Sequence, residues 1–210
     1  MMDIIREVQW DKRGVSVCFE GGETLRLSRA IGREWPWMAP GQEVSPEEWN
    51  AFLLPRQYSE GLAYAVKLLA MRDHAAGEVR AKLEARRYLP DAVDMVLYKL
   101  EKEKLLDDEA FAQKWAASRA RAGLGKARVR MELRAKGVPG EVIERVLAEG
   151  DGDEADAAMV AFARKQLRRH ASEEDQDAAM RKVLSAMARR GYGYSESARA
   201  IALALDDEEA

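Results

Sequence analysis

The sequence predicts a mainly α-helical protein, with three tandem three-helix repeats in an elongated curved array behind a small N-terminal antiparallel β-meander. Three observations support this prediction. Period-two alternation of apolar residues is confined to residues 2–27, helical spacing begins near residue 58, and one segment recurs at an offset of 50 residues. Because a three-helix repeat cannot bury its apolar face alone, neighbouring repeats are expected to stack.

Residues 2–27 predict three short strands. Val15, Val17 and Phe19 alternate with small or polar residues, which is typical of a strand buried on one face. The glycine pair at 21–22 indicates a hairpin turn. Since such a meander is marginal alone, we expect it to pack on another element.

A linker and a short helix are expected next. Residues 32–44 contain two glycines and two prolines, which is typical of a linker. Ser45 is placed as a helix N-cap, and Glu48 completes a capping box. Pro55 is expected to end this helix, and a new helical pattern begins near residue 58.

The internal repeat sets the predicted domains. Residues 83–88 align with 133–138, and the register continues without gaps from 92–97 to 142–147, while 187–192 forms a weaker third copy. The first helix of each repeat carries large apolar residues, and in the second repeat Phe111 and Trp115 are predicted core residues. The predicted domains are a β-rich extension with a short helix (1–57) and three helical repeats (58–106, 107–149 and 150–210).

Composition excludes several classes of protein. The chain has 210 residues, 47% hydrophobic and 34% charged, with a net charge of −3 and a pI near 5.7. A normal apolar fraction with high charge favours exposed, charged helices over disorder. The single cysteine, Cys18, excludes a disulfide framework and a Cys-based zinc site within one chain, and we expect it to be buried. With no apolar run of about 18 residues and no signal-peptide pattern, we expect a soluble cytoplasmic protein with no membrane contact.

No catalytic constellation is evident, so we expect no enzyme, no metal and no cofactor. His74 and His170 have no metal-ligand spacing and are expected at the surface. The glycines before Lys126 lack the spacing of a phosphate-binding P-loop. Asp107 and Asp108 are interpreted as acids at a helix start rather than as a metal-binding pair.

A local excess of positive charge indicates a binding surface. Residues 113–140 hold eight basic residues and one acid, Glu132. Lys126, Arg130 and Arg134 are four residues apart and share one helix face, where like charges repel and nothing within that helix offsets the repulsion. This pattern predicts an anionic partner, although acids elsewhere in the chain could neutralise the face instead. Further candidates on this patch are Arg119, Arg121 and Arg128, with a secondary basic patch at Arg164, Arg168 and Arg169.

Several segments together are similar to a known family. Residues 105–112, 125–130 and 132–138, with Arg72 and the helix 78–83, resemble the RecX regulatory proteins of bacteria in order and spacing. The resemblance covers about residues 58–147. It weakens in the third repeat, and the family's serine-rich helix start is replaced by residues 74–77.

The resemblance implies a function. RecX proteins bind the RecA filament on single-stranded DNA within its groove and lower its ATPase, strand-exchange and coprotease activities, with no catalytic residues of their own. Arg72 joins the candidate contacts on this basis, direct contact with the DNA stays open, and a monomer is expected. Two alternatives remain: a stand-alone nucleic-acid-binding module, which the acidic pI disfavours, and a helical-repeat scaffold for another partner.

Overall fold

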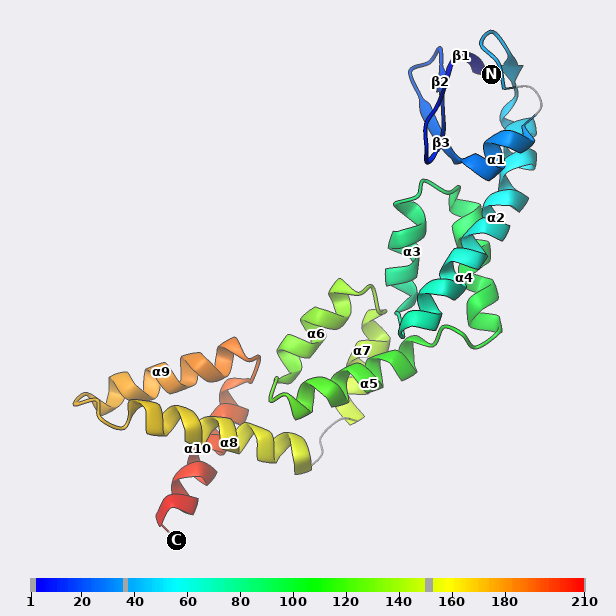
Figure 1. Ribbon diagram of the computed structural model, residues 1–210. Helices are drawn as coiled ribbons and strands as arrows, with labels where there is room; N and C mark the ends of the chain where they lie inside the picture. Colours follow the sequence, from blue (N-terminus) through cyan, green and yellow to red (C-terminus); the bar gives the residue numbers. More distant parts are fainter. Residues whose placement is uncertain (1–2, 36–37, 150–152, 210) are drawn as a thin grey trace. The chain divides into compact units, whose positions relative to one another are not determined.

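The computed structural model describes residues 3–35, 38–149 and 153–209 (Figure 1). The chain forms two compact units. The first comprises Met1–His74 with Glu78–Leu106, and the second comprises Ala75–Gly77 with Asp107–Ala210. The described residues hold ten helices and one four-stranded sheet, which confirms the predicted fold class. No helix among them is both long and apolar enough to cross a membrane.

The sheet of the first unit extends the predicted meander by one strand. Strands β1 (Asp3–Trp10), β2 (Gly14–Phe19) and β3 (Thr24–Ser28) pair antiparallel, and β4 (Glu43–Val44) pairs with β1, giving the order β3-β2-β1-β4. The expected linker therefore contains β4, as well as the second half of the short helix α1 (Arg29–Glu34). We missed both because two strand residues and one and a half helical turns are too short to show a period.

One face of the sheet packs on the helix that follows. Val15, Val17 and Leu53 are fully buried in one core, so the sheet finds the partner that we expected it to need. Cys18 is only partly buried, contrary to our expectation. The alternation that buries Val17 directs Cys18 to the opposite face of β2.

Helix α2 (Pro46–Met71) begins as predicted, with Ser45 and Glu48 forming a capping box. It does not end at Pro55, and our prediction of a break there was wrong. A proline removes one helical hydrogen bond and crowds the carbonyl four residues earlier. That residue, Ala51, is exposed, so its carbonyl can be solvated. The buried residues at 53, 57, 61 and 65 continue one stripe through the proline, and packing of this stripe maintains the helix.

Three helices follow the sheet: α2, α3 (Ala76–Glu84) and α4 (Pro90–Lys102). All but the first two residues of α3 belong to the first unit. They approach one another at Gly61, where an added Cβ would lie 3.3 Å from Val96 of α4 and 3.5 Å from Leu83 of α3. Glycine at this position therefore allows close packing of the three helices.

The second unit contains two further sets of three helices. Helices α5 (Asp108–Arg121), α6 (Lys126–Ala135) and α7 (Gly140–Glu149) share a core around Phe111, Leu133 and Ile143. Helices α8 (Asp153–His170), α9 (Gln176–Arg189) and α10 (Tyr194–Glu209) share another around Met187 and Ile201. Three helices per repeat agree with the fold class, whereas the exact domain boundaries remain a prediction.

The backbone carries the same repeat register as the sequence. After the second helix of each repeat, one residue is left-handed: Arg87 (φ 59°), Gly137 (φ 77°) and Gly191 (φ 88°). These three positions coincide in the sequence alignment. The second and third repeats also meet there, because Gly125 N donates to Arg190 O at 2.8 Å and Ala127 N to Gly191 O at 3.2 Å.

Candidate functional site

One group of predicted site residues gathers around Glu132, between α5 and α6. The Glu132 carboxylate accepts from Arg119 Nε at 2.7 Å, Trp115 Nε1 at 3.0 Å and Arg128 Nε at 3.3 Å. Burial of this carboxylate raises its pKa, but the hydrogen bonds from Arg119 and Trp115 outweigh burial, so the pKa of Glu132 lies below 4.5. The single acid of the basic segment therefore neutralises part of it.

A second group lies between α6 and α7. Arg130 donates to both carboxylate oxygens of Glu144, at 2.7 and 2.8 Å. Arg134 Nη2 is 3.8 Å from the same carboxylate, and its side chain is 64% exposed. The hydrogen bond from Arg130 lowers the pKa of Glu144.

These contacts correct our argument from mutual repulsion. Arg130 and Arg134 do share one side of α6, but Glu144 of the neighbouring helix offsets their repulsion. At about 100° per residue, Arg128 and Arg130 project about 200° apart around α6. The structure therefore forms two separate basic clusters, one facing α5 and the other facing α7, rather than one widened patch.

The remaining predicted contacts lie elsewhere. Arg72, in the first unit, joins the end of α2 to α3 through two hydrogen bonds to Glu78, at 3.1 and 3.2 Å. On α8, Arg168 and Arg169 are exposed and Arg164 is partly buried.

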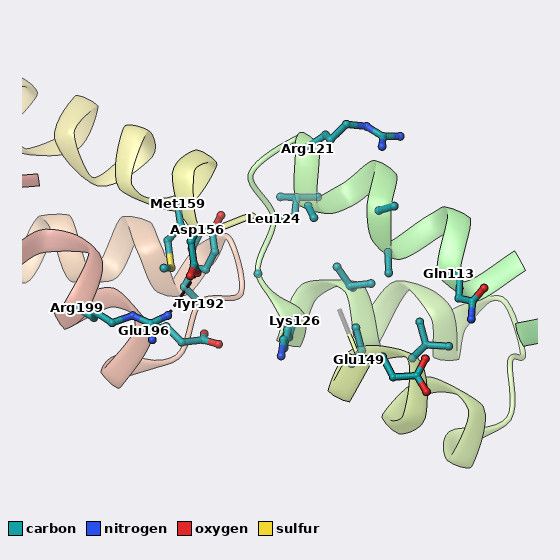
Figure 2. Close-up of a pocket in the computed structure, with 17 residues that line it drawn as sticks. Gln113, Arg121, Leu124, Lys126, Glu149, Asp156, Met159, Tyr192, Glu196 and Arg199 are labelled. Carbon is teal, nitrogen blue, oxygen red and sulfur yellow. Dashed lines mark hydrogen bonds and ion pairs between the residues drawn. The ribbon is translucent and has the colours of Figure 1, made fainter. Parts of the chain in front are cut away.

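A cavity of about 450 Å³ in the second unit is lined by Arg121 and Lys126 and by residues that we did not predict (Figure 2). Its lining comes from α5, α6, α7, α8 and α10, with alanines of α5 and Val129 supplying apolar surface. Arg199 of α10 pairs with Asp156 of α8 at 3.4 Å on its far wall. We missed this wall because the cavity depends on how two repeats pack, which no single helix pattern shows.

The other candidates for chemistry have structural roles. Asp107 is the N-cap that we predicted and accepts from Ala110 N at 2.8 Å. Asp108 instead accepts from Ala76 N at 2.8 Å, and burial raises its pKa. His74 is buried, with Nδ1 2.9 Å from Arg72 O, so our surface placement was wrong. Across the described residues, no group of three or more His, Cys, Asp or Glu side chains could hold a metal.

Known proteins are similar in sequence to this chain over most of its length. The model of the second three-helix domain of RecX matches residues 107–147. A regulatory protein RecX of Mycobacterium sp. (strain JLS) is 36% identical over 159 residues, which cover 73% of this chain and 86% of that protein. This chain belongs to the RecX family of regulatory proteins. The regulatory protein RecX of Corynebacterium efficiens is 35% identical over 148 residues, which cover 68% of this chain and 70% of that protein.

Solved RecX structures share the fold. A crystal structure of a regulatory protein RecX superposes with a TM-score of 0.62 and 18% sequence identity. The match covers 92% of this chain and 96% of the chain in that structure. The crystal structure of RecX from Lactobacillus salivarius superposes with a TM-score of 0.66 and 20% sequence identity. The match covers 72% of this chain and 98% of the chain in that structure. The RecX domain matched at 107–147 contains both basic clusters, together with Glu132 and Glu144.

Proposed function

We propose that this RecX protein binds the filament that RecA forms on single-stranded DNA and lowers its ATPase, strand-exchange and coprotease activities. It acts by binding rather than by catalysis, as a cytoplasmic monomer. The observation that carries the proposal is the 36% identity to a regulatory protein RecX across 73% of the chain, since the sequence resemblance implies that this family acts on RecA.

The second unit supplies the proposed contact surface. Arg121, Arg128 and Arg134 are exposed, and the ion pairs of Arg128 and Arg134 lie at 3.3 and 3.8 Å. Exposed ion pairs contribute about 0–1 kcal/mol to stability, so these arginines can exchange a carboxylate for an anionic partner at little cost. Arg119 and Arg130 are held more firmly and are proposed to position their neighbours. The full proposed set also includes Lys126 and Arg72, with Arg164, Arg168 and Arg169 as the secondary patch.

The test is a titration of the protein into a single-stranded-DNA-dependent ATPase assay with RecA from the same organism. We expect ATP hydrolysis to fall with increasing protein, and inhibition to weaken with salt because exposed charges are screened over about 10 Å at 0.1 M. No inhibition at any protein-to-RecA ratio would reject this role.

Charge variants test the contact surface separately. The variant Arg121→Ser/Arg128→Ser/Arg134→Ser should need about tenfold more protein for half-inhibition, since about 1.4 kcal/mol of weaker binding corresponds to a factor of ten. Its charge-matched control, Arg33→Ser/Arg181→Ser/Arg189→Ser, removes three exposed arginines outside the proposed set and should inhibit like the wild type. If the first variant folds and inhibits normally, these arginines are not the contact surface, and the secondary patch of Arg164, Arg168 and Arg169 becomes the candidate.

A further inference from the structure

A second cavity, of about 410 Å³, lies in the first unit between the sheet and the turn that joins α3 to α4. Four arginines from three segments line it. Arg13 comes from the turn between β1 and β2, Arg26 from β3, and Arg86 and Arg87 from the turn after α3. Glu60 of α2 is the acid on the lining.

Two of these arginines have established partners and two are available. Arg26 pairs with Asp11, and the Arg86 guanidinium lies 3.7 Å from the centre of the Tyr64 ring. Within the part of the chain that the structure describes, Arg13 and Arg87 have no acidic side chain at ion-pair distance. The lining therefore retains positive charge even after Glu60 is counted.

The backbone at Arg87 is strained, whereas the equivalent positions of the other two repeats are glycines that adopt the same conformation without strain. Its φ of 59° lies in the left-handed region, which is unfavourable for a residue with a Cβ. The equivalent residues, Gly137 and Gly191, are glycines with the same sign of φ. Folding alone would favour glycine at position 87, so the arginine found there points to a role for its side chain.

Two buried polar atoms lie beside the arginines. Tyr88 Oη and Glu60 Oε2 form no hydrogen bond of good geometry, although Tyr88 interacts with both Glu60 and Arg86. Burial and the nearby Glu60 carboxylate raise the pKa of Tyr88 to about 12, so its hydroxyl keeps a proton to donate at neutral pH. Gln57 of α2 holds the turn between α3 and α4 in place, because its Oε1 accepts a hydrogen bond from Leu89 N at 2.7 Å.

We propose that this cavity binds the phosphate groups of a single-stranded nucleic-acid backbone. Guanidinium groups match phosphate oxygens with paired hydrogen bonds, and here arginines from three separate segments line one cavity. Tyr88 is the aromatic residue on the lining, so the cavity suits backbone contact rather than a series of stacked bases. Arg13, from the turn between β1 and β2, and Arg87 are the two available phosphate ligands, while Arg26 and Arg86 add positive charge beside them. This gives the N-terminal segment a role independent of any contact with RecA.

The test measures binding of a fluorescein-labelled oligothymidylate to the full chain by anisotropy, without RecA, over a salt series. The variant Arg13→Ser/Arg87→Gly removes the two available arginines, and glycine at 87 suits the left-handed backbone. We expect about tenfold weaker binding, and the slope of log K against log salt should fall by about 0.7 for each phosphate that the variant no longer neutralises. The control variant Arg6→Ser/Lys102→Ser removes the same charge outside the cavity and should bind like the wild type.

Folding and ligand class are measured in parallel. The single variant Arg87→Gly should melt no lower than the wild type and still bind the oligonucleotide more weakly, which a purely structural role would not produce. Absence of wild-type binding would overturn the proposal, as would an equal loss in the control variant. Competition by polyglutamate as strong as that by unlabelled oligonucleotide would overturn it too, because the cavity would then recognise charge without preference for phosphate.

Discussion

Glu132 receives hydrogen bonds from three side chains on two helices, so a single residue ties α5 to α6. Its lowered pKa gives a pH signature. The unfolded carboxylate takes up a proton before the folded one does, so the stabilisation is present above about pH 4.5 and is lost as pH falls through the folded pKa.

We predict that Glu132→Gln lowers the free energy of unfolding by about 1–2 kcal/mol at pH 7, since charged hydrogen bonds are removed at a partly exposed site. Urea denaturation at several pH values measures this difference, which should shrink below pH 4.5. A difference that stays constant down to acid pH would mean that the carboxylate charge does not stabilise the fold.

Two aromatic residues of α5 differ in burial, and the difference sets their expected contributions. Phe111 is 7% exposed in the core of α5, α6 and α7. Trp115 stacks on it at 5.9 Å but is only partly buried, with the cations of Arg119 and Lys136 each 4.1 Å from its ring centre.

Phe111→Ala is therefore expected to cost about 3–5 kcal/mol. Trp115→Ala should cost less, about 2–3 kcal/mol, because part of its ring is already in water. Chemical denaturation of both variants tests the order, and a larger destabilisation by Trp115→Ala would contradict it.

Residue-level reasoning located the basic residues of the candidate site but not their partners. The excess of arginine over acid between 113 and 140 is visible in the sequence. Glu144 lies outside that window and reaches Arg130 only because α7 packs beside α6. An ion pair between helices depends on tertiary approach, which local periodicity does not encode.

At the scale of elements, the order of helices and strands could be predicted because long amphipathic segments carry a clear period. The capping box at Ser45 was found from two residues alone. Pro55 misled us, since its local preference opposes the packing of a buried stripe that runs from residue 53 to residue 65 of the 26-residue helix α2. The strand β4 depends on its pairing with β1, which joins segments far apart in the sequence.

The joint between the second and third repeats gives a prediction for these elements. At Gly191 an added Cβ would lie 2.4 Å from Arg128 N, and its φ is 88°. We expect Gly191→Ala to lower the free energy of unfolding by about 2–4 kcal/mol, because it strains the turn and disrupts the backbone hydrogen bonds there.

Gly140→Ala is the matched control, since an added Cβ there meets nothing within 4 Å. It should leave stability unchanged or raise it by up to about 1 kcal/mol. Thermal denaturation of both variants distinguishes the sites. Equal stability of the two variants would show that the two repeats do not depend on this joint.

At the scale of the whole molecule, charge is distributed unevenly. The net charge of −3 conceals basic clusters on α6 and an arginine-lined cavity beside the sheet. Attraction to an anionic partner depends on such local fields rather than on the pI. Membership in the RecX family supports a regulatory role in the context of RecA. The central claim of our proposal is a physical complex with the RecA filament.

Sedimentation of RecA filaments assembled on single-stranded DNA with a non-hydrolysable ATP analogue tests this claim most directly. We predict that the protein pellets with the filaments in a saturable and salt-sensitive manner, and that it stays in the supernatant when RecA is omitted. If the protein remains in the supernatant at every filament concentration at low salt, the claim is contradicted.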